Sequence, residues 1–202
     1  SSVRRVLVLD TDVAVLGNVW ELWSSFRRFQ GAVAGLTNEQ NDLYAPMVGK
    51  NGGLQLLDLE RMRTSRVYLQ LLDTFNVHGY KIGYLGDQTL YSLMTVAPAA
   101  NGTGDGRGLF HALPCGWNRQ TGTHMAGWKG FWAAHACDAP CHLLHGNFVE
   151  HKRFMESLKR DSSGGTCRKV VADHRAKDRL FRSGTPDARM LDMVQRTCCR
   201  SR

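Results

Sequence analysis

Two acidic side chains follow directly on a short apolar segment near the start of the chain. Residues 3–9 read VRRVLVL, an apolar and β-branched run that predicts a buried strand, and Asp10-Thr11-Asp12 comes next. Two carboxylates one residue apart at the end of a strand can converge on one hard divalent cation, and carboxylate oxygens suit Mn²⁺ or Mg²⁺. On its own, the motif is also typical of a polar turn that ends a strand.

A histidine much further along the chain is a candidate third ligand. His145-Gly146-Asn147 follows the apolar segment 141–144, which predicts another strand. A neutral imidazole is a good third ligand for manganese, and Gly146 would let the backbone come close to a phosphate. Lys152 follows His145 by seven residues and can place a positive charge beside a departing diphosphate. Taken alone, His145 is equally compatible with an ordinary core or surface histidine.

A third polar group opens a predicted helix in the middle of the chain. Leu85-Gly86-Asp87-Gln88 precedes apolar residues at helical spacing, so Asp87 and Gln88 belong to the start of that helix. A carboxylate and an amide side by side can hold sugar hydroxyls by paired hydrogen bonds. An ordinary helix cap by Asp87 is the alternative.

The segments that must position these side chains alternate between strands and helices. Apolar runs predict strands at 3–9, 31–35, 54–57, 108–113 and 141–144, and helical spacing predicts helices after Asn18, around 68–75 and from 85. This alternation predicts an α/β layer structure, in which ligands bind beyond the carboxyl ends of the strands. From about Lys159 the chain is polar and basic, so we expect a catalytic domain at 1–158 and a basic tail or peripheral helices at 159–202.

The composition fits a folded protein with an anionic partner. Of the 202 residues, 43% are hydrophobic and 22% are charged, which suits a packed globular domain and argues against global disorder. The formal net charge of +8 favours nucleic acid, a membrane surface or a phosphate-bearing ligand, although a solvated basic surface would carry the same charge. Because the sequence shows no aromatic and basic recognition motif, nucleic acid is not an expected partner. No apolar run is long enough to span a membrane.

Five segments in order along the chain carry a resemblance to a known family. They are residues 10–12 (DTD), 51–63 (NGGLQLLDLERMR), 85–88 (LGDQ), 113–120 (LPCGWNRQ) and 145–147 (HGN), with residues 35–44 (GLTNEQNDLY) in support. The series resembles glycosyltransferase family eight, and within it the xyloside xylosyltransferases, over about residues 3–150. The resemblance implies a GT-A nucleotide-sugar transferase fold with a mixed central sheet, of which the amino-terminal part is expected to be missing.

The resemblance also implies a role for each of these segments. Asp10, Asp12 and His145 would bind a manganese ion, with magnesium as the alternative, and Asp87 and Gln88 would lie close to the reacting carbon. The UDP-sugar donor would contact Thr11, Asn51, Gly52, Gly53, Leu85, Gln88, Gly146 and Lys152. The acceptor, a glycan or a glycoprotein, would contact Trp117, Asn118 and Asn147.

The six cysteines permit disulfides without fixing their pairing. The family resemblance implies that Cys115 and Cys137 are bonded, which fits an oxidising compartment. A structural zinc site formed by Cys137, Cys141, His142 and His145 is an alternative use of this region, although no second well-spaced cysteine pair completes the usual pattern.

The resulting hypothesis is a retaining transferase that moves a sugar, by resemblance xylose, from a UDP-sugar to a glycan acceptor such as a xylosyl-glucose on a protein. We expect front-face attack, since no second carboxylate is assigned as a nucleophile. The resemblance implies the lumen of the endoplasmic reticulum or Golgi, with membrane anchoring only through a segment upstream of this chain. Lys50, Gly52 and Thr89 depart from the family pattern, so a UDP-glucose or UDP-galactose transferase and a degenerate, non-catalytic member stay open as alternatives.

Overall fold

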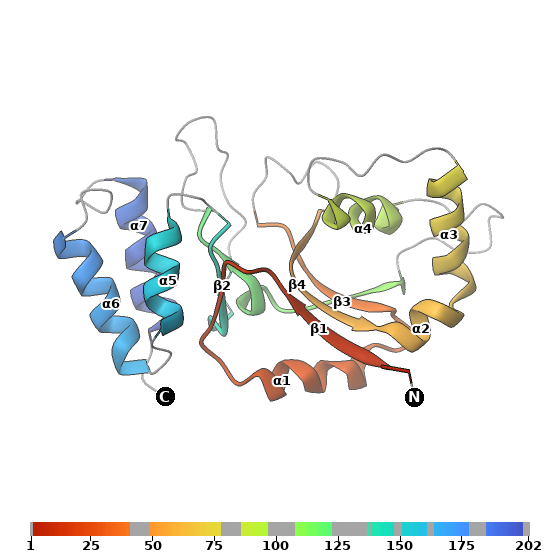
Figure 1. Cartoon of the computed structure of the whole chain (residues 1–202), viewed down its shortest axis with the longest axis horizontal. Helices are drawn as coiled ribbons and strands as arrows, with labels where there is room; N and C mark the ends of the chain where they lie inside the picture. Colours follow the sequence, from red (N-terminus) through yellow and green to blue (C-terminus); the bar gives the residue numbers. More distant parts are fainter. Residues whose placement is uncertain are drawn as a thin grey trace. The chain divides into compact units, whose positions relative to one another are not determined.

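The computed structural model of the chain describes residues 2–40, 49–77, 86–96, 108–122, 137, 139–147, 151–160, 164–177 and 185–199. Its contacts divide the chain into two compact units (Figure 1). The first unit comprises residues 1–9, 20–39 and 44–113, and the second comprises residues 10–19, 40–43 and 114–202.

The first unit is built on a mixed sheet. Its strands are β1 (Arg5–Leu9), β3 (Ala34–Asn38), β4 (Lys50–Asp58) and β5 (Phe110–Ala112), in the order β1-β4-β3-β5. Strand β4 is antiparallel to both of its neighbours, whereas β3 and β5 run parallel. The predicted α/β fold with a mixed central sheet is therefore confirmed.

Helices cover both faces of this sheet. The helical elements of this part of the chain are α1 (Val19–Trp23), the 3₁₀ helix η1 (Ser24–Arg28), α2 (Leu59–Thr64), α3 (Arg66–Val77) and α4 (Asp87–Val96). On one face, Leu36 packs in a buried cluster with Leu71 of α3 and Met94 of α4. On the other, Gly35 lies so close to the ring of Phe29 that a Cβ there would stand 2.8 Å from it. Figure 1 shows α3 and α4 on one side of the sheet and α1 on the other.

The prediction that the first strand is buried is wrong. Every residue of strand β1 is exposed or half-buried, and Val8 is 38% exposed. Within the described part of the chain, β1 pairs with β4 alone and so forms an edge of the sheet. An apolar and β-branched run indicates a strand but does not say whether that strand is central or at an edge.

The second unit holds a smaller sheet of three short strands. These are β2 (Val13–Val15), β6 (Arg119–Gln120) and β7 (Leu143–His145), in the order β2-β7-β6. Strand β2 is antiparallel to β7, and β6 is parallel to it. The 3₁₀ helix η4 (Cys115–Asn118) leads directly into β6. Strand β7 is thus the centre of this sheet.

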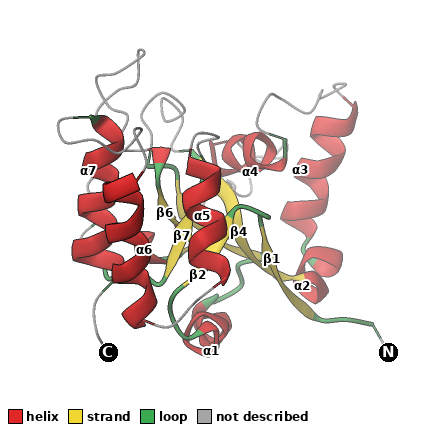
Figure 2. Cartoon of the chain, turned by 60° about the vertical axis from the view of Figure 1, so that its left-hand side comes forward, coloured by secondary structure: helices red, strands yellow, loops and turns green. Residues whose placement is uncertain are grey.

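A group of helices completes the second unit. It contains α5 (Lys152–Arg160), α6 (Gly164–Lys177), α7 (Pro186–Met193) and the π-helix η8 (Val194–Cys198), which lie together in Figure 2. Their apolar side chains share one buried cluster, in which Phe154, Val171 and Leu191 are almost fully inaccessible. This part of the chain therefore has a packed core in spite of its polar and basic composition. None of the helices that the structure describes is long and apolar enough to cross a membrane.

Three disulfides join the described cysteines, all within the second unit. The predicted bridge between Cys115 and Cys137 is confirmed, with a Cα–Cα distance of 5.8 Å. Two further bridges, which the sequence did not predict, connect Cys141 with Cys198 and Cys167 with Cys199. Because Cys137 and Cys141 are both oxidised, the alternative zinc site is excluded.

Candidate metal and donor site

Three predicted ligands come together in the second unit. Nε2 of His145 lies 3.6 Å from Oδ2 of Asp10 and 3.4 Å from Oδ1 of Asp12. One ligand atom from each residue falls within 4.8 Å of the other two. His145 is only 4% exposed, whereas Asp10 is exposed and Asp12 is half-buried. Two carboxylate oxygens and one imidazole nitrogen thus converge from one side on a space open to solvent.

Strand pairing explains why residues so far apart in sequence meet here. In the antiparallel register of β2 and β7, Val13 lies opposite His145. Asp12, the residue before Val13, therefore lies beside the imidazole of His145. The backbone N–H of Gly146 donates to the carbonyl oxygen of Asp12 at 2.8 Å, which continues the pairing beyond the strand. A Cβ at Gly146 would clash with Met155 and would lie 3.1 Å from that carbonyl oxygen. The glycine therefore permits a close approach at this point.

A buried amide sets the orientation of the His145 ring. Nδ1 of His145 lies 3.0 Å from Oδ1 of Asn118, which is fully buried. Since an amide oxygen only accepts hydrogen bonds, Nδ1 carries the proton in this arrangement and donates it. The backbone oxygen of Asn118 accepts from the side chain of Gln40 at 2.7 Å, which fixes the amide-bearing residue in turn. Nε2 is left to face the two aspartates, as a metal-binding histidine requires.

The electrostatics of the group favour charged carboxylates. The hydrogen bond from His145, helped by the positive charges of His145 and Lys159, holds the pKa of Asp12 below its ordinary value, although burial acts in the opposite direction. Asp12 therefore stays ionised at any pH near neutrality. A divalent cation binds deprotonated ligands, and ionised carboxylates beside the unprotonated Nε2 of a neutral imidazole would meet that requirement.

A cavity of about 570 Å³ borders this group. It is lined by Thr11, Asp12, Gly146, Asn147, Lys152, Met155, Glu156 and Lys159. Four of these residues, Thr11, Asp12, Gly146 and Lys152, were predicted to bind metal or donor. Lys152 and Lys159 both belong to α5, so one helix supplies two positive charges to a cavity that the metal ligands border. A diphosphate requires this combination of cationic side chains and a place for a metal ion.

A second polar group lies within the first unit, around the start of α4. One carboxylate oxygen of Glu39 accepts hydrogen bonds from the amide groups of both Asn51 and Gln88, each at 2.9 Å. The amide oxygen of Gln88 accepts from the N–H of Gly52 at 3.2 Å, and that of Asn51 accepts from the N–H of Gly53 at 2.9 Å. Glu39, which is 4% exposed, thus fixes the two amides that the sequence predicted to bind the donor.

Asp87 belongs to the same group. Its Oδ2 accepts a 2.5 Å hydrogen bond from Nε2 of Gln55, and a Cβ built at Gly52 would stand 3.2 Å from its Oδ1. The absence of a side chain at Gly52 therefore gives Asp87 the room it occupies. The structure brings Asp87, Gln88, Asn51, Gly52 and Gly53 together, and Leu85 lies outside the described residues.

The predicted acceptor residues have different environments. Trp117 is 6% exposed and stacks on His142, with ring centroids 4.3 Å apart. Asn118 is buried against His145, as described above. Asn147 is exposed, accepts from the N–H of Gly122 at 2.9 Å and donates to Oε1 of Gln120 at 3.2 Å. Contact of these residues with an acceptor stays a prediction.

Sequence reasoning missed two residues of these groups and assigned a third to another role. Lys159 and Glu39 carried no signal, since an isolated lysine or glutamate is ordinary on a protein surface. Asn118 was predicted, but for a different role. Its task as the partner of His145 depends on the parallel pairing of β6 with β7, which places Gln120 opposite His145. Strands of two and three residues are too short to be read from periodicity.

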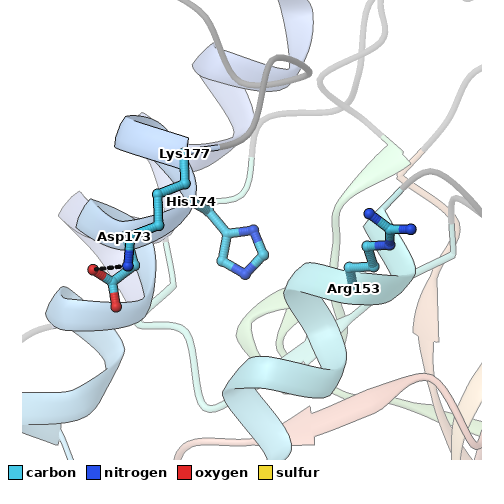
Figure 3. Close-up of a pocket in the computed structure, with 4 residues that line it drawn as sticks. All are labelled: Arg153, Asp173, His174 and Lys177. Atoms are coloured by element: carbon cyan, nitrogen blue, oxygen red, sulfur yellow. Dashed lines mark hydrogen bonds and ion pairs between the residues drawn. The ribbon is translucent and has the colours of Figure 1, made fainter.

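A further cavity, of about 310 Å³, lies between α5 and α6 of the same unit (Figure 3). It is lined by Arg153, Asp173, His174 and Lys177. Nζ of Lys177 pairs with Asp173 at 3.4 Å, and Nε2 of His174 lies 3.1 Å from Oγ of Ser157 on α5. Among the described residues that line it, Asp173 is the one carboxylate and pairs with a lysine, so this lining differs from the donor set of the first cavity.

Known glycosyltransferases resemble the chain in sequence and in structure. The chain is 29% identical over 178 residues to Xyloside xylosyltransferase 1 of Mus musculus, a match that covers 72% of this chain and 43% of that protein. Xylosyl- and glucuronyltransferase LARGE2s of Danio rerio is 30% identical over 148 residues, covering 61% of this chain and 18% of that protein. No protein-family model matches the chain.

The crystal structure of mouse Xyloside xylosyltransferase 1 in its apo form superposes with a TM-score of 0.56 at 28% identity, covering 72% of this chain and 58% of that one. The chain thus spans less than half the length of the mouse relative's sequence. Both comparisons agree with the resemblance that the ordered motifs implied. The chain is therefore similar to the xyloside xylosyltransferases in sequence and has the α/β fold of GT-A glycosyltransferases.

Proposed function

We propose that this chain carries the metal-binding and donor-binding part of a retaining glycosyltransferase that moves a sugar, xylose, from a UDP-sugar to a glycan acceptor. The observation that carries the proposal is the convergence of Asp10, Asp12 and Nε2 of His145 beside a cavity lined by lysines. The similarity to xyloside xylosyltransferases supports the same reaction class.

The ligand set fits a divalent cation. Two carboxylate oxygens and a neutral imidazole suit Mn²⁺, and Mg²⁺ fits less well because it favours oxygen ligands alone. Asn118 supplies the outer hydrogen bond that fixes a metal-binding histidine. When bound, the cation would neutralise the negative charge that develops on the diphosphate as the sugar–phosphate bond breaks.

The second unit would hold the diphosphate. Lys152 lines the cavity with its side chain and can pair with a phosphate oxygen as a point charge. Gly146 lines the same cavity, and its lack of a side chain lets Met155 and the Asp12 backbone pack against it. Thr11 lies between the two acidic ligands and completes this wall of the donor site.

By resemblance, we propose that the polar group around Asp87 and Gln88 binds the transferred sugar. Asp87 offers a carboxylate to sugar hydroxyls, and Gln88 is held next to it by Glu39 and the backbone of Gly52. A rigid carboxylate and amide fix the orientation of a sugar ring, which lowers the entropic part of the barrier. Asn51 and Gly53 would line the same part of the donor site.

We propose front-face attack as the route to retention. The bond from the anomeric carbon to the phosphate oxygen breaks, the acceptor hydroxyl oxygen bonds to the same face of that carbon, and the hydroxyl proton passes to the departing phosphate. Lys152 stabilises the diphosphate as it leaves. Asp87, which a hydrogen bond from Gln55 holds in position, would orient the sugar by this route.

The acceptor and the compartment follow by similarity. A xylosylated glycan on a protein is the proposed acceptor, with Trp117, Asn118 and Asn147 on its side of the site. Three disulfides suit an oxidising compartment, so we propose the lumen of the endoplasmic reticulum or Golgi. Residues 1–158 would supply the catalytic part, with the helices of 159–202 beside it.

Calorimetry with UDP tests the proposal. UDP should bind in the presence of Mn²⁺ and only weakly in the presence of a chelator, and Asp12→Ala should abolish the dependence on Mn²⁺. Asp192→Ala is the matched control, since Asp192 is an exposed acid of the same unit that pairs with Arg175. Unchanged Mn²⁺-dependent binding in Asp12→Ala would end the proposal. Product analysis with UDP-xylose, UDP-glucose and UDP-galactose would then identify the sugar.

A second candidate function rests on the sugar site. Gly52 and Thr89 stand where the family resemblance leads us to expect a small side chain and an aspartate, and Asp87 occupies space beside Gly52. Both changes alter the surface offered to the sugar, so the chain could bind a nucleotide diphosphate and transfer another sugar or none. Mn²⁺-dependent UDP binding without transfer from any of the three donors would favour this function.

A further inference from the structure

Lys159 makes a contact that no motif assigns. Its Nζ, at the carboxyl-terminal end of α5, donates a hydrogen bond to the backbone oxygen of Thr11. Thr11 is the residue between the two acidic ligands, so the ammonium group stands at the metal site itself. Its positive charge is one of the causes that lower the pKa of Asp12.

Lys152 and Lys159 lie on the same face of α5. They are seven residues apart, so their Cα atoms are separated by two helical turns, or about 10 Å, along one side of the helix. Both line the 570 Å³ cavity, and both are exposed. Among the described residues, the carboxylates of Asp10, Asp12 and Glu156 and the imidazole of His145 also line or border it. A diphosphate in this cavity would have a lysine towards each end of the helix.

We propose that Lys159 is a second cationic positioning residue for the donor diphosphate, and that it neutralises the acidic ligands while no metal ion is bound. The inference rests on the proposed function and goes further, since it gives one side chain two effects of opposite sign. Towards a bare cation, the ammonium is a like charge and weakens binding. Towards a diphosphate, it is an opposite charge and strengthens binding.

The test measures both affinities in the same variants. Lys159→Met keeps the length of the side chain and removes its charge, and Lys159→Arg keeps the charge. Lys177→Met is the matched control, because Lys177 is an exposed lysine of the neighbouring helix, 77% accessible, that lines the other cavity (Figure 3). Mn²⁺ affinity without nucleotide is measured by the free Mn²⁺ signal in electron paramagnetic resonance, and UDP affinity at saturating Mn²⁺ by calorimetry.

Opposite changes are expected. In Lys159→Met, Mn²⁺ should bind about three- to tenfold more tightly and UDP about three- to tenfold more weakly, as removal of one partly screened charge implies. Lys159→Arg should restore most of the UDP affinity, and Lys177→Met should change neither constant. The dual role is overturned if the two affinities fall together, as damage to the fold would cause, or if either stays unchanged. Absence of Mn²⁺-dependent UDP binding by the unaltered protein would refute the proposed function first, and this inference with it.

Discussion

Asn118 offers the sharpest test of how the metal site is built. Its side-chain oxygen accepts from Nδ1 of His145 at 3.0 Å, and both residues are almost fully buried, at 0% and 4% exposure. Asn118→Leu keeps the approximate volume and removes the acceptor. Without that acceptor, the imidazole is no longer held in the tautomer with its proton on Nδ1. A cation must then compete with a proton on Nε2.

The expected loss of Mn²⁺ affinity in Asn118→Leu follows from the hydrogen bond between Asn118 and His145. Loss of an outer hydrogen bond to a ligating histidine weakens metal binding by about 10- to 100-fold, which corresponds to about 1.4–2.7 kcal/mol. A buried N–H without an acceptor also lowers the free energy of unfolding by about 1–3 kcal/mol. Asn118→Asp is the matched variant, because it keeps an oxygen at the same place and should retain most of the Mn²⁺ affinity.

The assay is a titration of Mn²⁺ without nucleotide, followed by electron paramagnetic resonance well below the thermal midpoint of each variant. Circular dichroism establishes that Asn118→Leu is folded at that temperature. If the folded leucine variant binds Mn²⁺ as tightly as the unaltered protein, the assigned role of Asn118 is wrong. If Asn118→Asp loses as much affinity as Asn118→Leu, packing rather than the hydrogen bond orients His145.

Three further predictions concern stability. Burial lowers the pKa of Lys50, so the unfolded chain binds more protons across an alkaline window, and the free energy of unfolding rises with pH there. Lys50→Met should flatten that rise and add about 1 kcal/mol to the free energy of unfolding at neutral pH, or roughly 2–4 °C in thermal midpoint. An unchanged slope of the free energy of unfolding against alkaline pH would contradict this explanation. Gly146→Ala should cost about 1–3 kcal/mol by its clash with Met155, measured by urea unfolding. Because the two residues touch, the double variant with Met155→Ala should lose less than the sum of the two single losses. Replacing both Cys141 and Cys198 by Ser opens a bridge spanning 57 residues and should cost about 4 kcal/mol; a loss below about 1 kcal/mol would show that the bridge hardly restricts the unfolded chain.

The candidate metal ligands could be predicted from residue type. Their proximity in space could not be predicted in the same way. Asp10 and Asp12 follow an apolar run, and His145 follows another, which is a recognisable pattern. The structure shows that the pairing of Val13 with His145 brings them together. Strands β2 and β7 have three residues each, too few for periodicity to establish a register. The prediction that the three residues share a site therefore depended on the family resemblance.

The burial of β1 and two of the disulfide pairings could not be predicted from the sequence. The boundaries of the longer elements were predicted within a few residues; for example, the strand predicted at 54–57 is the core of β4 (Lys50–Asp58). The exposure of β1 could not be foreseen, because burial depends on which strands lie beside it. Six cysteines allow fifteen complete pairings, so two of the three bridges could not be predicted without coordinates.

The position of His145 depends on the carboxyl-terminal helices as well as on its own sheet. Strand β7 pairs with β2 on one side and β6 on the other, and Cys141, just before it, is bonded to Cys198 in η8. A boundary placed by composition near Lys159 passes through α5, the helix that lines the 570 Å³ cavity and packs in the same buried cluster as α6 and α7. These helices have a basic surface, but their apolar side chains form a buried cluster that includes α5, and four of the six cysteines link them to one another and to the start of β7. They therefore support the candidate metal site.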